Sequence, residues 1–176
     1  MHDIEAGGPR GERTVSEAPG EAGRIESINV SGGGVPKSSR VEAWVSRNGM
    51  YGDTQADQKL HGGPERAICI YAVELIEALQ NEGHPIGFGT TGEILTVSRV
   101  DWERVVPGTM WKTGDVVLEI ASYTAPCKTI QDSFSNKRYK RISQKVNPGW
   151  SRVYARVLEE GVVRVGAGFA AVSLLK

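Results

Sequence analysis

The stretch LHGGPERAICIYAVELIEALQNEG, residues 60–83, contains a turn, a strand and the clearest helix that the sequence predicts. Two glycines and a proline at 62–64 are typical of a tight turn. The apolar run at residues 66–71 predicts a strand. Residues 72–83 predict an amphipathic helix, because apolar side chains recur there at helical spacing and a glycine ends the pattern. His61 lies on the edge of the turn, where a side chain can face a cleft.

Short strands are predicted across most of the remaining chain, separated by glycine-rich turns. Many short strands with few helices favour a mainly β fold, a barrel or sandwich with a few peripheral helices. Strands and helices do not alternate regularly, which disfavours a doubly wound sheet. Residues 151–166 predict a hairpin that turns at Glu160-Gly161. The other expected strands are residues 24–30, 41–46, 92–98, 116–123 and 169–175.

The length and composition suggest one domain of 176 residues with a tail. Residues 1–23 are rich in Gly, Glu, Pro, Ala and Ser and predict a flexible tail, so that residues 24–176 form the domain. The 21 basic and 21 acidic residues cancel, which argues against a protein that coats nucleic acid. No apolar run approaches the ~18 residues of a membrane span, and the first residues lack the apolar core of a secretory signal.

Several common chemistries lack their motifs. The segment GGGVPKSS superficially resembles a phosphate-binding loop, but Pro36 precedes Lys37 and the G-K-[ST] ending is missing. The segment is either a glycine-rich turn or a loop at the mouth of a pocket where Lys37 meets an anion. No C-x-x-C, H-E-x-x-H or G-x-S-x-G motif is present. No G-x-G-x-x-G fingerprint for flavin or NAD follows a strand. Electrons for a redox reaction would therefore have to come from another protein.

The two cysteines differ in their surroundings and do not make a disulfide framework. A reducing cytoplasm is therefore the expected location. Cys69 lies inside an apolar strand, where a cysteine is usually an inert small hydrophobe. Cys127 follows a strand, Pro126 precedes it and Lys128 follows it, which predicts a partly exposed thiol that ionises readily. A thiolate is a soft ligand, suited to molybdenum or sulfur chemistry.

A strongly basic segment, SFSNKRYKRISQKV at residues 133–146, predicts a helix with Tyr139, Ile142 and Val146 along one face. Its basic side chains form either a solvated helix face or a wall that attracts anions toward a site, together with Arg152 and Arg156.

Five segments of the chain, in their order and spacing, resemble those of a known family: GVPKSS, GMYGDTQADQKLHGGPERAICIY, TTGEILTV, PGTMWKTGDVVLEI and YTAPCKTI. Together they resemble the MOSC domain, the C-terminal domain of molybdenum cofactor sulfurase, over roughly residues 24–166. The resemblance implies a MOSC-type β-barrel with a few peripheral helices. It implies a role in binding molybdenum cofactor (molybdopterin) or in carrying sulfur, with Cys127 as the molybdenum ligand or the persulfide-carrying nucleophile. Pyridoxal phosphate binding is a further association of the family.

Molybdenum cofactor is a pterin dithiolene that carries a phosphate, so its site needs cations, polar groups and a soft ligand. His61 either orients a ligand or braces its own loop. Ile94 and Ala167 stand where the family pattern commonly has an asparagine and an aspartate. Besides Cys127, the expected cofactor-binding residues are Lys37, Asp53, Gln55, His61, Arg66, Glu93, Lys128, Arg152 and Arg156.

Three functions stay open at this point. The first is an enzyme that takes electrons from a donor protein and reduces N-hydroxylated small molecules, such as base analogues. The second is a sulfur carrier that receives a persulfide from a sulfur-donor protein and passes it on. The third is a degenerate barrel that binds a small anion or a protein without catalysis. Neither a nucleic acid nor a membrane is an expected partner, and the sequence leaves the oligomeric state open.

Overall fold

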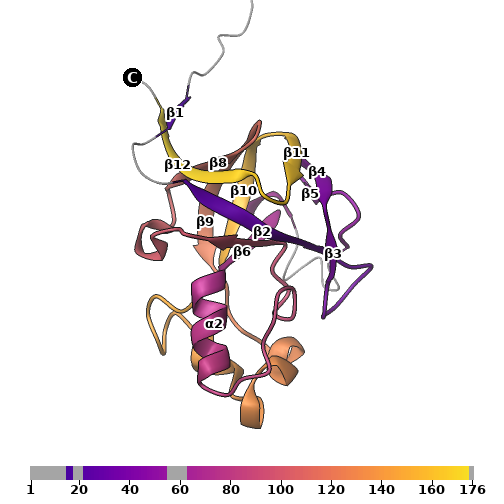
Figure 1. Ribbon diagram of the computed structural model, residues 1–176, viewed down its shortest axis with the longest axis vertical. Coiled ribbons are helices and arrows are strands. Elements are labelled where there is room, and N and C mark those ends of the chain that lie inside the picture. Colours follow the sequence, from indigo (N-terminus) through magenta and orange to yellow (C-terminus); the bar gives the residue numbers. More distant parts are fainter. Residues whose placement is uncertain (1–14, 18–21, 55–62, 175–176) are drawn as a thin grey trace, which may run out of the picture.

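The computed structural model describes residues 15–17, 22–54 and 63–174 of the chain. Its centre is a closed β-barrel of seven strands in the order β2-β12-β8-β9-β10-β6-β7 (Figure 1). The mainly β fold predicted from the sequence is therefore confirmed. The barrel strands are β2 (Gly23–Val30), β6 (Ile68–Ala72), β7 (Leu95–Ser98), β8 (Met110–Thr113), β9 (Val116–Tyr123), β10 (Val153–Glu159) and β12 (Gly168–Leu174).

The barrel closes between its first and last strands. Gly23 pairs with Phe169 and Arg24 with Gly168, both antiparallel. β2 continues from there along β7. A Cβ atom on Gly23 would lie 2.4 Å from Val100 Cγ2 and 2.9 Å from the Phe169 carbonyl oxygen, so the seam requires a residue without a side chain.

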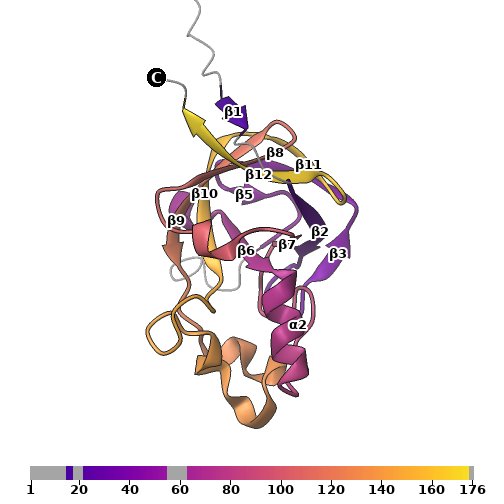
Figure 2. The ribbon, with the colours of Figure 1, turned by 60° about the vertical axis from the view of Figure 1, so that its left-hand side comes forward.

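Strands β6 and β7 are the only parallel pair of neighbours among the described barrel strands. A parallel pair needs a crossover connection, and helix α2 (Val73–Asn81) supplies it. The helix buries Val73, Ile76 and Leu79, the apolar face that the sequence predicts. It lies outside one end of the barrel (Figures 1 and 2).

A second, small sheet contains β11 (Gly161–Arg164), β4 (Glu42–Ser46) and β5 (Gly49–Met50). The prediction of a hairpin between β10 and β11 is wrong, because β11 pairs with β4 rather than with β10. β10 remains paired with β9 as far as Glu159, so its edge on that side is already occupied. The chain turns into the second sheet through Glu160 and Gly161.

Two short strands extend the edges of the main sheet. β3 (Ser38–Arg40) pairs with β2, and β1 (Val15–Glu17) pairs with β12. β1 falls within the segment expected to be a tail. The other residues of that segment up to residue 21 lie outside the described residues, so the flexible tail stays a prediction.

The expected helix over residues 133–146 is replaced by short 3-10 helices. Asn136 and Lys137 have φ values of 56° and 55°, and this left-handed backbone is incompatible with a continuous helix. Ile142 is buried, but Val146 is exposed rather than on the same buried face. The 3-10 helices of this region are η3 (Lys128–Ser133), η4 (Ser135–Lys137) and η5 (Tyr139–Ile142), and two others are η1 (Pro64–Arg66) and η2 (Trp102–Arg104).

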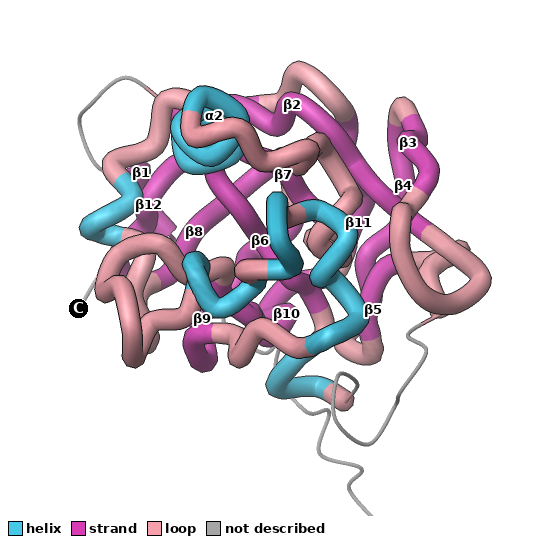
Figure 3. The backbone as a smooth tube through the Cα atoms, turned by 90° about the horizontal axis from the view of Figure 1, so that it is seen from below, coloured by secondary structure: helices cyan, strands magenta, loops and turns pink. Residues whose placement is uncertain are grey.

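Helices α2 and η3–η5 enclose a second apolar cluster outside the barrel core. Tyr71 from β6 and Ile76 from α2 pack there with Ile130, Phe134 and Ile142 from the 3-10 region. Figure 3, seen from this end, shows the helices crossing over the barrel strands. Among the described residues, no helix has the length and apolar character that a membrane crossing requires.

Candidate functional site

The candidate site lies on the outer face of the barrel, over β6 and β10. Side chains alternate along a strand, and Ile70 and Ala155 belong to the barrel core. Cys69 and Tyr154, which are register partners, therefore face outward. Arg152, directly before β10, continues this outward row. Cys69 and Tyr154 are thus carried on strands with their side chains outside the barrel.

Arg152 is the most deeply buried cation of the site, with 6% of the residue exposed. Its Nη1 donates a hydrogen bond to the Thr91 carbonyl oxygen. Its Nε is buried and has no hydrogen-bond partner within the described residues. A Cβ on Gly92 would lie 3.9 Å from Nη1, so the turn before β7 passes close to the guanidinium. A buried polar group of this kind calls for a partner, and here an external ligand can provide it.

Glu93 is fully buried beside Arg152. Its carboxylate accepts hydrogen bonds from the Gly89 backbone N–H at 2.5 Å and from Thr91 Oγ1 at 2.7 Å. Burial raises the pKa of Glu93, against the opposing effect of these bonds and of the Arg152 charge. The next residue, Ile94, donates its N–H to the Cys69 carbonyl oxygen at 2.8 Å. Glu93 therefore fixes the turn that holds Arg152.

Lys37 and Asp53 form a buried ion pair at the edge of the site. Their side chains are 6% and 3% exposed, and Asp53 also accepts the Ser31 backbone N–H at 2.9 Å. The backbone N–H of Lys37 donates a hydrogen bond to the Gly89 carbonyl oxygen at 3.1 Å. This bond places the ion pair beside the turn that Glu93 fixes. The ammonium of Lys37 is already neutralised by Asp53. Cofactor contacts by these two residues stay a prediction.

Cys127 lies just beyond the end of β9 and directly before η3, and is partly exposed. The Thr124 N–H donates to the Arg152 carbonyl oxygen at 3.0 Å, so this segment remains aligned with the start of β10. Burial raises the pKa of Tyr154 to about 12, and the charges of Cys69 and Cys127 act in the same direction. Cys127 therefore lies close enough to Tyr154 for its charge to act on the phenol.

Arg66 joins the same group, because its guanidinium carbon lies 5.7 Å from the centre of the Tyr154 ring. The structure thus gathers Cys127, Arg152 and Arg66 around Tyr154. All three were expected from the sequence.

Two other expected residues lie differently. Arg156 is half-buried and forms ion pairs with Glu65 at 2.8 Å and Glu119 at 3.8 Å. Lys128 is exposed on η3. Gln55 and His61 lie outside the described residues, so their expected roles stay predictions.

Thr124 and Tyr154 were not named from the sequence. The hydroxyl of Thr124 is buried and has no hydrogen-bond partner in the described part of the chain. Alternation along residues 152–156 was a usable signal for Tyr154, since it lies midway between two arginines of that row. Nothing in the sequence around Thr124 indicates that its hydroxyl is left unsatisfied.

A family model for the MOSC domain matches residues 57–169 of the chain. The chain belongs to the MOSC domain family. Uncharacterized protein YflK of Bacillus subtilis is 29% identical over 138 residues, which cover 78% of this chain and 62% of YflK. Protein YiiM of Escherichia coli is 25% identical over 74% of this chain and 57% of YiiM. The MOSC chain therefore spans about 60% of the length of these two relatives.

A third similar protein is fungal. A protein named "Reductase" from Gibberella moniliformis is 32% identical over 70% of this chain, but the match covers only 22% of that protein.

Solved structures share the fold. The crystal structure of YiiM from Geobacillus stearothermophilus superposes with a TM-score of 0.68 at 25% identity, covering 86% of this chain and 75% of that chain. YiiM from Escherichia coli gives a TM-score of 0.65 at 21% identity, covering 87% of this chain and 71% of that chain.

MOSC domains are associated with molybdenum cofactor in general, and the residues of this site fit that group. Cys127 offers a partly exposed soft ligand. Arg152 and Thr124 offer buried polar atoms that lack partners within the described residues. No three His, Cys, Asp or Glu side chains of the described residues gather to hold a metal ion. Pyridoxal phosphate binding stays a prediction.

Proposed function

We propose that this MOSC protein binds molybdenum cofactor on the outer face of β6 and β10 and reduces N-hydroxylated small molecules. The observation that carries the proposal is a buried Arg152 whose Nε lacks a partner among the described residues. The Thr124 N–H, three residues before the partly exposed Cys127, donates a hydrogen bond to the Arg152 carbonyl oxygen. When bound, the cofactor supplies a redox centre that passes two electrons to the substrate. The reaction R–NHOH + 2H⁺ + 2e⁻ → R–NH₂ + H₂O then breaks the N–O bond and releases water.

The protein's own residues bind and orient in this proposal. Cys127 supplies the soft ligand, and Arg152 and Arg66 supply positive charge for the phosphate and the pterin edge. The Thr124 hydroxyl supplies one further hydrogen-bonding group. Glu93 acts on Arg152 by fixing the turn that holds it. The two electrons come from a separate donor protein, and the name of the fungal relative, "Reductase", agrees with this reaction class.

The test is metal analysis of protein produced in a host that makes molybdenum cofactor. We expect one molybdenum per chain in the wild type, and loss of the metal in Cys127→Ser. Cys69→Ala is the matched control, because it removes the other thiol and should retain the metal. Reduction of an N-hydroxylated base analogue, driven by reduced viologen, should follow the metal content. A metal-free wild type from such a host would contradict the proposal.

A sulfur carrier is the second candidate, and the exposure of Cys127 favours it. In that case the thiol carries a persulfide, and its outer sulfur passes to an acceptor. The same samples separate the two functions. Sulfur released by a reductant from wild type but not from Cys127→Ser, without molybdenum, would support the carrier.

A further inference from the structure

Positive charge is concentrated in one part of a chain whose net charge is zero. Between Cys127 and Arg156 there are eight basic residues and one acidic residue. This segment begins at the cysteine of the candidate site, forms η3–η5 in its first half and ends in β10. The charge is therefore segregated next to the site rather than spread over the molecule.

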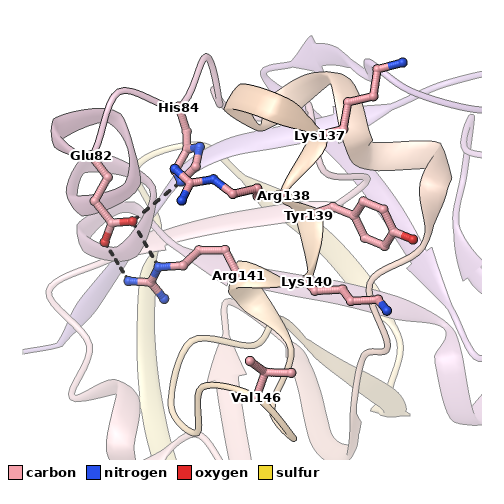
Figure 4. A pocket seen from close by; sticks show the side chains of 8 residues that line it. All are labelled: Glu82, His84, Lys137, Arg138, Tyr139, Lys140, Arg141 and Val146. Carbon is pink, nitrogen blue, oxygen red and sulfur yellow. Dashed lines mark hydrogen bonds and ion pairs between the residues drawn. The ribbon is translucent and has the colours of Figure 1, made fainter.

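Part of this charge surrounds a pocket of about 530 Å³ at the end of the molecule that carries α2 (Figure 4). The pocket is separate from the residues gathered around Tyr154. Its lining residues come from the end of α2 and from η4 and η5 onward: Glu82, His84, Lys137, Arg138, Tyr139, Lys140, Arg141 and Val146.

One wall of the pocket is rigid. Arg141 donates two hydrogen bonds to the Glu82 carboxylate, at 2.6 and 2.9 Å, and its guanidinium lies 3.7 Å over the centre of the Trp150 ring. The hydrogen bond from Arg141 lowers the pKa of Glu82. His84 is buried, and its Nδ1 accepts the Ser135 N–H at 3.1 Å. The backbone that carries the basic side chains is thus fixed to the end of α2.

The remaining cations have no ion-pair partner among the described residues. Lys137, Arg138 and Lys140 are all exposed. Arg138 extends toward His84, whereas Lys137 and Lys140 extend away from it and from each other (Figure 4). Because these charges do not converge on one point, they suit a broad acidic surface better than a single small anion.

The surface also carries apolar and aromatic side chains. Val146 is 61% exposed, and the ring of Tyr139 lies between the two lysines (Figure 4). Aromatic and apolar side chains next to polar groups are typical of a protein–protein interface. Three cations that lack ion-pair partners in the described residues are few for a nucleic-acid site, where affinity comes from several phosphate contacts.

We propose that the face formed by Lys137, Arg138, Tyr139, Lys140 and Val146 is the docking surface for an acidic protein that donates electrons to the site. This inference rests on the proposed reductase function, which requires such a donor. Complementary charge across an interface raises the association rate and depends on ionic strength. The donor would supply the two electrons of the N–O cleavage, one or two at a time according to its own cofactor.

Binding is tested first, without turnover, with a plant-type [2Fe–2S] ferredoxin and a flavodoxin as acidic probes. The variant Lys137→Glu/Arg138→Glu/Lys140→Glu is compared with Arg40→Glu/Arg104→Glu/Lys112→Glu, which changes the net charge equally on other elements. We expect wild type and control to bind at least one probe, and binding to weaken about tenfold from roughly 20 to 200 mM salt as screening increases. The pocket variant should bind at least tenfold more weakly at low salt.

Turnover then separates this inference from the proposed function. Donor-driven reduction should fall at least tenfold in the pocket variant, while viologen-driven reduction at high salt should be unchanged. Absence of viologen-driven reduction in every protein would overturn the reductase function but not the binding result. The Lys137→Gln/Arg138→Gln/Lys140→Gln variant should show a smaller loss of binding and guards against misfolding of the reversed-charge variant.

Three outcomes would overturn the docking surface. One is equal binding of the probes by the pocket variant and the control. Another is the absence of binding of both probes to the wild type. The third is tighter binding of a single-stranded oligonucleotide than of either probe, lost in the pocket variant, because the surface would then recognise nucleic acid.

Discussion

Cys69 and Cys127 are two thiols in opposite environments. Cys69 is 3% exposed, and burial raises its pKa to about 11. Cys127 is partly exposed at the end of a strand. Since the thiolate is the reactive form, we expect one thiol per native chain to react with a disulfide reagent near pH 8, and both to react after unfolding. The native Cys127→Ser protein should show no fast reaction. A native Cys69 that reacts as fast as Cys127 would contradict this assignment.

Glu93 predicts a pH dependence of stability with a definite sign. Burial raises its pKa in the folded state, so the folded protein binds this proton more tightly than the unfolded chain. Stability from this group is present below the ordinary glutamate pKa, about 4.3, and is lost as pH rises through the folded value. Denaturant titrations of wild type and Glu93→Gln at several pH values measure it. The difference in unfolding free energy should shift in favour of Glu93→Gln as pH rises, and a shift of opposite sign would refute the prediction.

At the scale of elements, the ion pair of Lys37 and Asp53 joins two loops that flank the site. The loop after β2 carries Lys37, and the segment after β5 carries Asp53. Removing one partner of a buried pair leaves an uncompensated charge, so Lys37→Met should lower the free energy of unfolding by about 3–5 kcal/mol. Lys37→Met/Asp53→Leu should cost less than the sum of its two single changes.

An exposed pair is the control for that experiment. Arg164 and Glu42 pair at 2.9 Å, with side chains 63% and 55% exposed. Arg164→Met should cost less than about 1 kcal/mol, because solvent screens the attraction between exposed charges. Equal losses for Lys37→Met and Arg164→Met, measured by urea titration, would show that burial does not govern the first pair.

Most strands could be predicted from the sequence, whereas their partners could not. The strand over residues 116–123 follows from its short apolar run, rich in β-branched residues, and the structure confirms it as β9. The prediction of a hairpin at Glu160-Gly161 was wrong, because a turn motif does not indicate which strand edge is still available for pairing. The helix over residues 133–146 failed because its periodicity is interrupted by the left-handed backbone at Asn136 and Lys137. The choice of pairing strand and the sign of the backbone φ angle both depend on tertiary packing.

For the site, the sequence could predict which reactive residue types take part. It could not predict which of their polar atoms find hydrogen-bond or ion-pair partners. Cys127 could be named because a thiol after a strand, with Lys128 beside it, is visible in the sequence. Arg152 could be named because it follows a strongly basic segment that could attract anions. The buried Thr124 hydroxyl without a described partner and the neutralisation of Lys37 by Asp53 are properties of the folded arrangement. They required the structure.

At the scale of the whole molecule, closure of the barrel depends on the space at Gly23. An added Cβ would lie 2.4 Å from Val100 Cγ2 and 2.9 Å from two backbone carbonyl oxygens. Gly23→Ala should therefore lower the free energy of unfolding by about 2–3 kcal/mol, as expected for overpacking. Gly168→Ala is the matched control at the same seam, since its Cβ would meet nothing closer than 3.8 Å. Equal melting temperatures for the two variants would contradict a tight seam.

That seam also sets the order of events during protein synthesis. Gly23 pairs with Phe169, so the ribosome must add 146 further residues before the partner of β2 exists. At about 5–20 residues per second this wait lasts roughly 7–30 s. β2 covers one edge with β7 once residues 95–98 have emerged. On its other edge β3 pairs only with Ile28–Val30, so the end at Gly23 and Arg24 stays open until the final strand is made. The nascent chain thus presents an unpaired strand edge for most of its synthesis, the state in which a β protein is most exposed to aggregation.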